Sequence, residues 1–92
     1  MKRLKNENVG GKIVKDNDIY QLRDNTTLKN LVLSSTLLHA GKQTTGHKHD
    51  GQEEVYFFVT GKGEMLIDEE RFAVEPGDIV LIEDGEFHRV YN

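Results

Sequence analysis

The sequence predicts an all-β fold. Apolar residues recur mostly at every second position or in short solid runs, which is the periodicity of β-strands. Turn-forming residues interrupt this pattern at short, fairly even intervals, and no segment has a convincing helical period. Many short strands with glycine-rich turns indicate a sandwich, a jelly roll or a barrel, because each of these architectures buries one face of every strand.

The strand segments follow in order from the apolar runs. We expect strands near residues 12–14, 19–22, 30–38, 43–49, 54–60, 64–67, 71–74, 79–82 and 87–91. Residues 61–63 and 68–70 each join two apolar runs over a gap of hairpin size. Residues 75–78 are typical of a tight corner, because Pro76 fixes its own φ and Gly77 accepts a positive one.

Length and composition bound the domain count. A chain of 92 residues predicts one domain spanning 1–92, with a small core. The polar residues 1–8 are expected to form a flexible or exchanged N-terminal arm. The sequence has no cysteine, which excludes disulfides and thiolate ligands, so any bound metal must be held by nitrogen and oxygen.

The charge pattern excludes several classes of partner. Twelve Lys and Arg residues are set against 16 Asp and Glu residues, and the formal charge of -4 is spread along the chain. This balance argues against a nucleic-acid partner. The basic start, residues 1–5, is not followed by an apolar run, so it predicts neither a signal peptide nor a membrane span. We expect a cytoplasmic protein.

Two histidines share one face of a predicted strand. Alternation places His47 and His49 on the same side, with Lys48 on the other. Positions two apart on a strand are roughly 6–7 Å from each other, from a rise of about 3.3 Å per residue. Imidazoles that bind a metal at about 2.0–2.1 Å can bridge that gap. The two histidines can therefore share one ion.

A glutamate and a third histidine complete the candidate set. Glu54 opens a very apolar strand directly after the predicted turn at residues 50–53, so a hairpin returns it beside the histidines. Burying this carboxylate alone would be costly, and a cation is one of the few groups that can compensate it. His88 lies much later, between Phe87 and Val90, on another predicted core strand.

At these residues the sequence resembles the cupin family. The first family motif is matched by Gly41, His47, His49, Glu54 and Gly61, and the second by Gly77, Gly85, His88 and Asn92. Glu83 stands where the family usually has proline, so the turn before His88 is expected to be less rigid. The resemblance covers residues 41–92. It implies a jelly-roll barrel, or double-stranded β-helix, with His47, His49, Glu54 and His88 as metal ligands.

The predicted site would hold one divalent ion: iron, manganese, zinc, nickel or cobalt. Three neutral imidazoles and one carboxylate leave a net charge near +1, which favours a small anionic, oxygen-rich ligand. We expect an apolar pocket around it, with Tyr56 as the one inward acid or base. The residues predicted to line this pocket are Gln43, Tyr56, Phe58, Met65 and Phe87.

The sequence leaves two functional hypotheses open. The first is an enzyme with the chemistry found in the resembled family: dioxygenase, decarboxylase or sugar isomerase. Lys48 and Arg89 neighbour ligands and are expected to point away from the pocket, which lowers the isomerase hypothesis because a phosphate needs cations. The second hypothesis is a non-catalytic module, in which the metal recognises a ligand or stabilises the barrel.

Both faces of the strand after Glu54 are apolar. Tyr56, Phe58 and Thr60 are expected to face inward, whereas Val55, Phe57 and Val59 face outward. An apolar outer face predicts packing on a second sheet in a homodimer, with burial against this chain's own second sheet as the alternative. A partner chain is also expected to supply the edge strand that relatives carry after the second motif. His39 lies outside both motifs and is expected to be a surface or capping residue.

Overall fold

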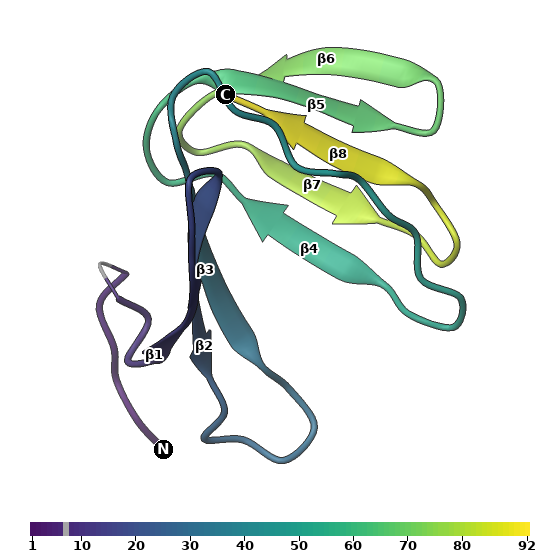
Figure 1. The fold of residues 1–92 in the computed structure, drawn as a ribbon. Coiled ribbons are helices and arrows are strands. Elements are labelled where there is room, and N and C mark those ends of the chain that lie inside the picture. The colour runs from purple at the N-terminus through teal and green to yellow at the C-terminus, as the bar shows by residue number, and fades with distance from the viewer. Residues whose placement is uncertain (7) are drawn as a thin grey trace. The chain divides into compact units, whose positions relative to one another are not determined.

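The computed structural model describes residues 1–6 and 8–92 as strands, turns and loops (Figure 1). The strands are β1 (Lys12–Asp16), β2 (Tyr20–Asn25), β3 (Leu33–Leu38), β4 (Glu54–Phe57), β5 (Gly63–Ile67), β6 (Glu70–Val74), β7 (Ile79–Ile82) and β8 (His88–Tyr91). They belong to two compact units, Met1–His39 and Ala40–Asn92. No helix in the described part of the chain is long and apolar enough to cross a membrane. The all-β prediction is confirmed.

The N-terminal unit is a three-stranded antiparallel sheet in the order β1-β2-β3. The turn between β1 and β2 is built on Asn17, whose Oδ1 accepts hydrogen bonds from the backbone amides of Ile19 and Tyr20, both at 2.9 Å. Among the described residues of this unit, Val9 is the one buried hydrophobic side chain. The predicted arm, residues 1–8, includes Glu7, which lies outside the described residues, and its flexibility or exchange stays a prediction.

The C-terminal unit contains two antiparallel sheets. β4 pairs with β7, and β5 lies between β6 and β8. Segment 41–47 runs beside β8, where the isolated bridges Gln43–Tyr91 and His47–His88 connect the two. The predicted strand at residues 43–49 is therefore wrong as a regular strand. Backbone hydrogen bonds also connect Thr44 with Val90 and Lys42 with Asn92, but the register shifts by one residue between the two bridges.

The core of the C-terminal unit lies between the inner faces of its two sheets. Met65, Val74 and Ile82 are almost fully buried there, from β5, β6 and β7. Alternation places the next layer: the side chains packed against these three are Tyr56, Phe58, Ile67, Phe72, Val80 and Val90. The predicted inward position of Thr60 is wrong, because β4 ends at Phe57 and Thr60 is exposed.

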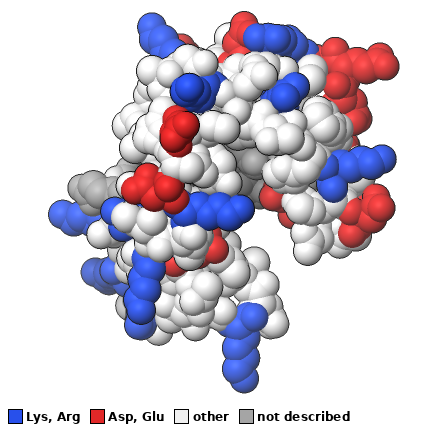
Figure 2. Space-filling view, viewed as in Figure 1, with Lys and Arg blue, Asp and Glu red and all other residues white. Residues whose placement is uncertain are grey.

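The surface carries charges of both signs. Figure 2 shows acidic and basic side chains interspersed on the face in view. Two arginines, Arg71 and Arg89, lie on the outer face of the β6-β5-β8 sheet, both opposite Leu66. There the Arg71 guanidinium stacks 3.9 Å from the Tyr91 ring centroid, and Nε of Arg71 donates to Oε1 of Glu64 at 2.6 Å. Arg71 is thus neutralised within its own sheet.

Candidate metal centre

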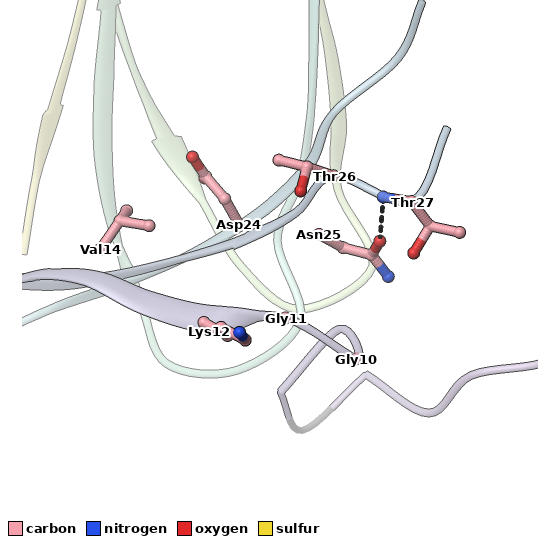
Figure 3. Close-up of a pocket in the computed structure, with 8 residues that line it drawn as sticks. All are labelled: Gly10, Gly11, Lys12, Val14, Asp24, Asn25, Thr26 and Thr27. Carbon is pink, nitrogen blue, oxygen red and sulfur yellow. Dashed lines mark hydrogen bonds between the residues drawn. The ribbon is translucent and has the colours of Figure 1, made fainter. Parts of the chain in front are cut away.

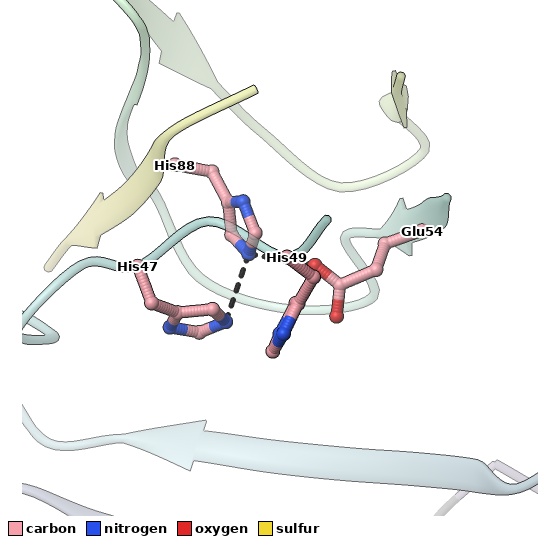
Figure 4. Close-up of side chains that lie close together, drawn as sticks. All are labelled: His47, His49, Glu54 and His88. Carbon is pink, nitrogen blue, oxygen red and sulfur yellow. Dashed lines mark hydrogen bonds and ion pairs between the residues drawn. The ribbon is translucent and has the colours of Figure 1, made fainter. Parts of the chain in front are cut away.

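His47 and His88 face each other across the pairing of segment 41–47 with β8. The amide of His47 donates to the carbonyl of His88 at 3.1 Å, and the amide of His88 donates back to the carbonyl of His47 at 2.9 Å. Residues opposite each other in an antiparallel pair point to the same face. Their Nε2 atoms consequently approach to 3.0 Å (Figure 4).

His49 and Glu54 flank a turn that is fastened to the loop before His88. The carbonyl of His49 accepts a hydrogen bond from the Gly85 amide at 3.0 Å. Two residues further on, the Gly51 amide donates to Oδ1 of Asp84 at 2.6 Å. These two bonds connect residues 49–51 of the first sequence motif with residues 84–85 of the second. The predicted ligands from the two motifs are therefore held close to one another.

The four predicted ligands converge on one point. One donor atom from each of His47, His49, Glu54 and His88 lies within 4.8 Å of the other three, and Figure 4 shows the side chains turned toward one another. Cis ligands that bind an ion at about 2.1 Å are roughly 3 Å apart, close to the Nε2–Nε2 distance found here. The group could hold a metal ion.

The bonding of His88 provides an independent test of this fit. Its Nδ1 lies 3.2 Å from the carbonyl oxygen of Glu86, which can only accept, so Nδ1 carries the proton. In the neutral ring, Nε2 then presents a lone pair. That lone pair faces Oε2 of Glu54 at 2.6 Å, and this oxygen is buried without a hydrogen bond of acceptable geometry.

Two acceptor atoms only 2.6 Å apart, such as Nε2 of a neutral His88 and Oε2 of Glu54, repel each other unless a positive charge lies near both. A proton on Nε2 of His88 could serve either Glu54 or His47, but only one of them. A divalent cation satisfies all the converging lone pairs at once. The His88 side chain is 2% exposed and the Glu54 side chain 32% exposed, so hydration by water can compensate the Glu54 carboxylate only in part. The donor set fits a metal ion.

The protonation equilibria of the site agree with its use as a ligand set. Burial, reinforced by the neighbouring His88 and His49, lowers the pKa of His47 from 6.5, against the opposing effect of Glu54. The ring is therefore neutral near pH 7, the form that binds metal. Burial and then the Glu54 carboxylate raise the pKa of Tyr56 to about 12. Its hydroxyl stays protonated, so it can donate a hydrogen bond but cannot act as a base.

The residues predicted to line a pocket occupy different environments. Tyr56 and Phe58 are half-buried against the core, and the Tyr56 ring lies 5.8 Å from the His88 ring. Met65 is 0% exposed and packs inside the core. Gln43 is exposed and lies opposite Tyr91. Because Tyr91 is three positions after His88 on β8, Tyr91 and Gln43 lie on the face of the sheet opposite to His88.

The Phe87 ring packs against the backbone of segment 41–47 at Gly46. A Cβ atom built on Gly46 would lie 2.5 Å from Cζ of the Phe87 ring, and Gly46 has a φ of 84°. The positive φ favours glycine at this position, and any other side chain would also have to displace the Phe87 ring. The Phe87 ring is in this way engaged with the backbone next to His47.

Several residues that hold the ligands were not found from the sequence. Asp84 fastens the turn after His49, and Glu86 replaces the rigidity that proline would give at position 83. The Glu83 amide donates to Oε1 of Glu86 at 2.7 Å, and the Glu86 amide donates to the carbonyl of Glu83 at 3.1 Å. The turn before His88 is thus closed from both sides. The one sequence signal for these contacts was the presence of Asp and Glu in the turn before His88, since acidic side chains in turns often accept hydrogen bonds from backbone amides.

A separate depression of about 350 Å³ lies in the N-terminal unit (Figure 3). It is bordered by Gly10, Gly11, Lys12, Val14, Asp24, Asn25, Thr26 and Thr27. Asn25 organises it, since its amide nitrogen donates to the carbonyl of Val9 at 2.8 Å and its Oδ1 accepts from the Thr27 amide at 3.0 Å. None of the four converging donors borders this depression.

His39 also belongs to the N-terminal unit, where its Nε2 lies 3.2 Å from the carbonyl of Asn17.

Comparison with known sequences identifies relatives. The chain is 35% identical over 60 residues to an uncharacterised protein of Methanocaldococcus jannaschii, covering 65% of this chain and 48% of that protein. It is 34% identical over 88 residues to a glucose-6-phosphate isomerase of Thermococcus litoralis, covering 82% and 46%. An oxalate-binding protein of Thermotoga maritima is 29% identical over 55 residues, covering 60% and 46%. The chain thus spans just under half the length of these relatives.

Solved structures share the fold. The plu4264 protein of Photorhabdus luminescens matches with a TM-score of 0.74 at 16% identity, covering 100% of this chain and 75% of that one. A predicted oxalate decarboxylase of Thermotoga maritima matches with a TM-score of 0.58 at 22% identity, covering 79% and 52%. These matches confirm the jelly-roll fold. The family model described as a cupin domain matches residues 35–92, and the chain therefore belongs to the cupin family.

Proposed function

We propose that this cupin holds one divalent metal ion on His47, His49, Glu54 and His88 and uses it to bind a small organic acid. The observation that carries the proposal is the buried Oε2 of Glu54, which has no hydrogen bond and lies 2.6 Å from Nε2 of His88. A cation removes the repulsion between these two acceptors. The nitrogen and oxygen donors suit iron, manganese, zinc, nickel or cobalt.

The surroundings of the metal centre favour a carboxylate over a phosphate ester. The depression that Glu54 borders is lined otherwise by Glu53, Val55, Leu81, Ile82 and Glu83, and none of these described residues is Lys or Arg. Arg89 is bonded to the carbonyl of Thr44 through its Nε at 2.8 Å. The metal, with a net charge near +1, would then be the one strong attraction for an anion.

The names of two relatives refer to organic acids. One is called an oxalate-binding protein, and another, 33% identical over 52 residues, is called 5-nitrosalicylic acid 1,2-dioxygenase and comes from Bradyrhizobium. The glucose-6-phosphate isomerase has a phosphorylated substrate by its name, and isomerisation of such a sugar is the less favoured function here. Oxidation or decarboxylation of the acid would be the catalytic form of the proposal.

A non-catalytic role in binding is the second candidate. The Tyr56 ring lies 5.8 Å from the ring of His88, and the pKa of Tyr56 is raised to about 12. A reaction that needs a protein base would therefore not obtain it from Tyr56. Metal-centred chemistry and simple ligand binding remain compatible with these residues.

Water relaxation at bound Mn²⁺ tests the proposal. The chain loaded with Mn²⁺ should enhance proton relaxation, and oxalate should reduce the enhancement because it displaces water from the ion. Inorganic phosphate should reduce it much less. The Glu54→Gln variant is the control for site-bound Mn²⁺. An enhancement unaffected by oxalate, or lowered equally by phosphate, would contradict the organic-acid proposal.

Assays of gas exchange separate the two candidates. The metal-loaded protein is incubated with oxalate and with aromatic hydroxy acids, while oxygen uptake and carbon dioxide release are followed. Turnover that disappears in His88→Ala supports the enzyme. Binding of oxalate without turnover supports the binding module.

We also infer a homodimer formed through the outer face of the β4–β7 sheet. Val55 lies opposite Leu81, and Phe57 opposite Ile79, so all four side chains share one face. Their exposed fractions are 67%, 70%, 63% and 57%. Within the described chain this sheet is only two strands wide, and such a sheet is marginal by itself. A second copy offers the same apolar face in a self-complementary contact.

Sedimentation velocity at micromolar concentration checks the dimer. Phe57→Lys should shift the protein to a monomer without loss of metal, because Phe57 points away from Glu54 and Tyr56. Leu31→Lys is the matched control, since Leu31 is 69% exposed in the N-terminal unit. A monomeric native protein would overturn the inference. The cytoplasmic location stays a prediction from the sequence.

A further inference from the structure

Segment 41–47 contains one residue more than the stretch of β8 that it accompanies. Gln43 lies opposite Tyr91 and His47 opposite His88, so four steps along one chain correspond to three along the other. An extra residue of this kind is a β-bulge, which bends the backbone and redirects the side chains beyond it. We refer to residues 44–46 as the ligand bulge.

The ligand bulge determines the face on which His47 lies. If the register at Gln43 and Tyr91 continued without it, Gly46 would lie opposite His88 and His47 opposite Phe87. A slip of one residue moves every following side chain to the other face of a sheet. His47 would then face away from His88, and the proposed metal ion would lose a ligand.

Two side chains supply the bonds that the bulge disrupts. The Thr44 amide donates to the carbonyl of Val90 at 2.9 Å, as in a regular ladder. The return bond is altered, because the Val90 amide donates to the Thr44 hydroxyl at 3.0 Å instead of to the Thr44 carbonyl. That carbonyl accepts from Nε of Arg89 at 2.8 Å.

We propose that Arg89 and Thr44 are positioning residues for the metal centre, because together they fix the ligand bulge that turns His47 toward His88. Arg89 neighbours His88 on β8 and therefore belongs to the opposite, outer face of the sheet. From there its guanidinium holds the displaced carbonyl without contact to the ion. The proposal rests on the proposed metal site.

Arg71 provides a matched control on the same face. Its guanidinium stacks on Tyr91, as that of Arg89 does at 5.8 Å, and its Nε is bonded to Glu64. Of these two arginines, only Arg89 is bonded to the ligand bulge. Replacing either arginine removes one positive charge from the outer face, but only one replacement frees the Thr44 carbonyl.

Cobalt titration of the purified protein, followed by visible absorption, tests the proposal. Arg89→Met should weaken Co²⁺ affinity about tenfold and alter the d–d spectrum as His47 leaves the ion, in line with the 10–100-fold effects of partners outside the ligand shell. Arg89→Lys should recover part of the affinity, because an ammonium can donate a single hydrogen bond to the carbonyl. Arg71→Met should stay within about twofold of the native protein.

Thr44 offers a second pair of variants in case Arg89→Met fails to fold. Thr44→Val keeps the shape but removes the acceptor of the Val90 amide, and it should weaken Co²⁺ binding with the same spectral change. Thr44→Ser keeps the hydroxyl and should bind as the native protein does. Equal affinities and spectra for Val and Ser at this position, or for Arg89→Met and Arg71→Met, would overturn the proposal.

Failure of the metal site itself would be seen separately. A native protein that binds no Co²⁺ would refute the proposed function. The bulge would then be judged on the metal-free protein by nuclear Overhauser contacts between the rings of His47 and His88. These contacts should be present in Thr44→Ser and lost in Thr44→Val, and their persistence in Thr44→Val would overturn the inference.

Discussion

The two units of the chain use apolar residues very differently. In Ala40–Asn92, two sheets enclose Met65, Val74 and Ile82, and His88 is the one buried polar residue among those described. In Met1–His39, only Val9 is buried among the described hydrophobic residues. One unit thus builds its own core, whereas the other exposes most of its apolar side chains.

This difference indicates where the function is organised. A metal ligand must be held in place by surrounding residues, and in the C-terminal unit hydrogen bonds next to a packed core could hold the proposed ligands. The N-terminal sheet has local order from Asn17 and Asn25 but little buried apolar surface of its own. We therefore expect mutations in the two units to differ in kind, with ligand loss and large destabilisation confined to the second.

The largest difference is expected between two histidines. His88→Ala should weaken Co²⁺ retention by more than the roughly 10–100-fold that a residue outside the ligand shell contributes. His39→Ala should leave retention unchanged, since His39 contacts the carbonyl of Asn17 in the N-terminal unit. Elemental analysis after dialysis measures both. Equal Co²⁺ retention in the two variants would contradict the proposal that metal binding depends on the C-terminal unit.

A second contrast concerns packing. Met65→Ala should lower the free energy of unfolding by about 2–5 kcal/mol, because Met65 is fully buried and its truncation leaves a cavity. Leu22→Ala, at a half-buried position of β2, should cost roughly 1 kcal/mol. Urea denaturation of the metal-free variants gives both values. A larger loss for Leu22→Ala would show that the N-terminal sheet has a substantial core after all.

The sequence pattern was sufficient to find the four converging side chains but not the residues that hold them in place. Alternation and motif spacing place Glu54 on the inner face of β4 and predict that His88 is buried, and the structure has both. The ligand bulge could not be predicted, because it depends on a bond between Thr44 and Arg89, which are 45 residues apart. A period of two assumes a regular strand, and by that rule alone Gln43 and His47 share a face without any indication of a bulge.

The smallest expected effect is on pH dependence. Because the folded state lowers the pKa of His47, the unfolded chain binds this proton more readily, and stability should fall as the pH drops through 6.5. The loss should level off once the folded state is protonated too. His47→Gln should show a shallower fall between pH 7.5 and pH 5 in urea denaturation of metal-free protein. An identical fall in both proteins would contradict the contribution of His47.

Metal content tests the central claim most directly. The native chain, saturated with Co²⁺ and then dialysed, should retain one ion per chain, bound through three nitrogens and one protein oxygen by X-ray absorption. The double variant Glu54→Gln with His88→Ala should retain none. An ion that survives in the double variant, or a native chain that retains no ion, would contradict the account.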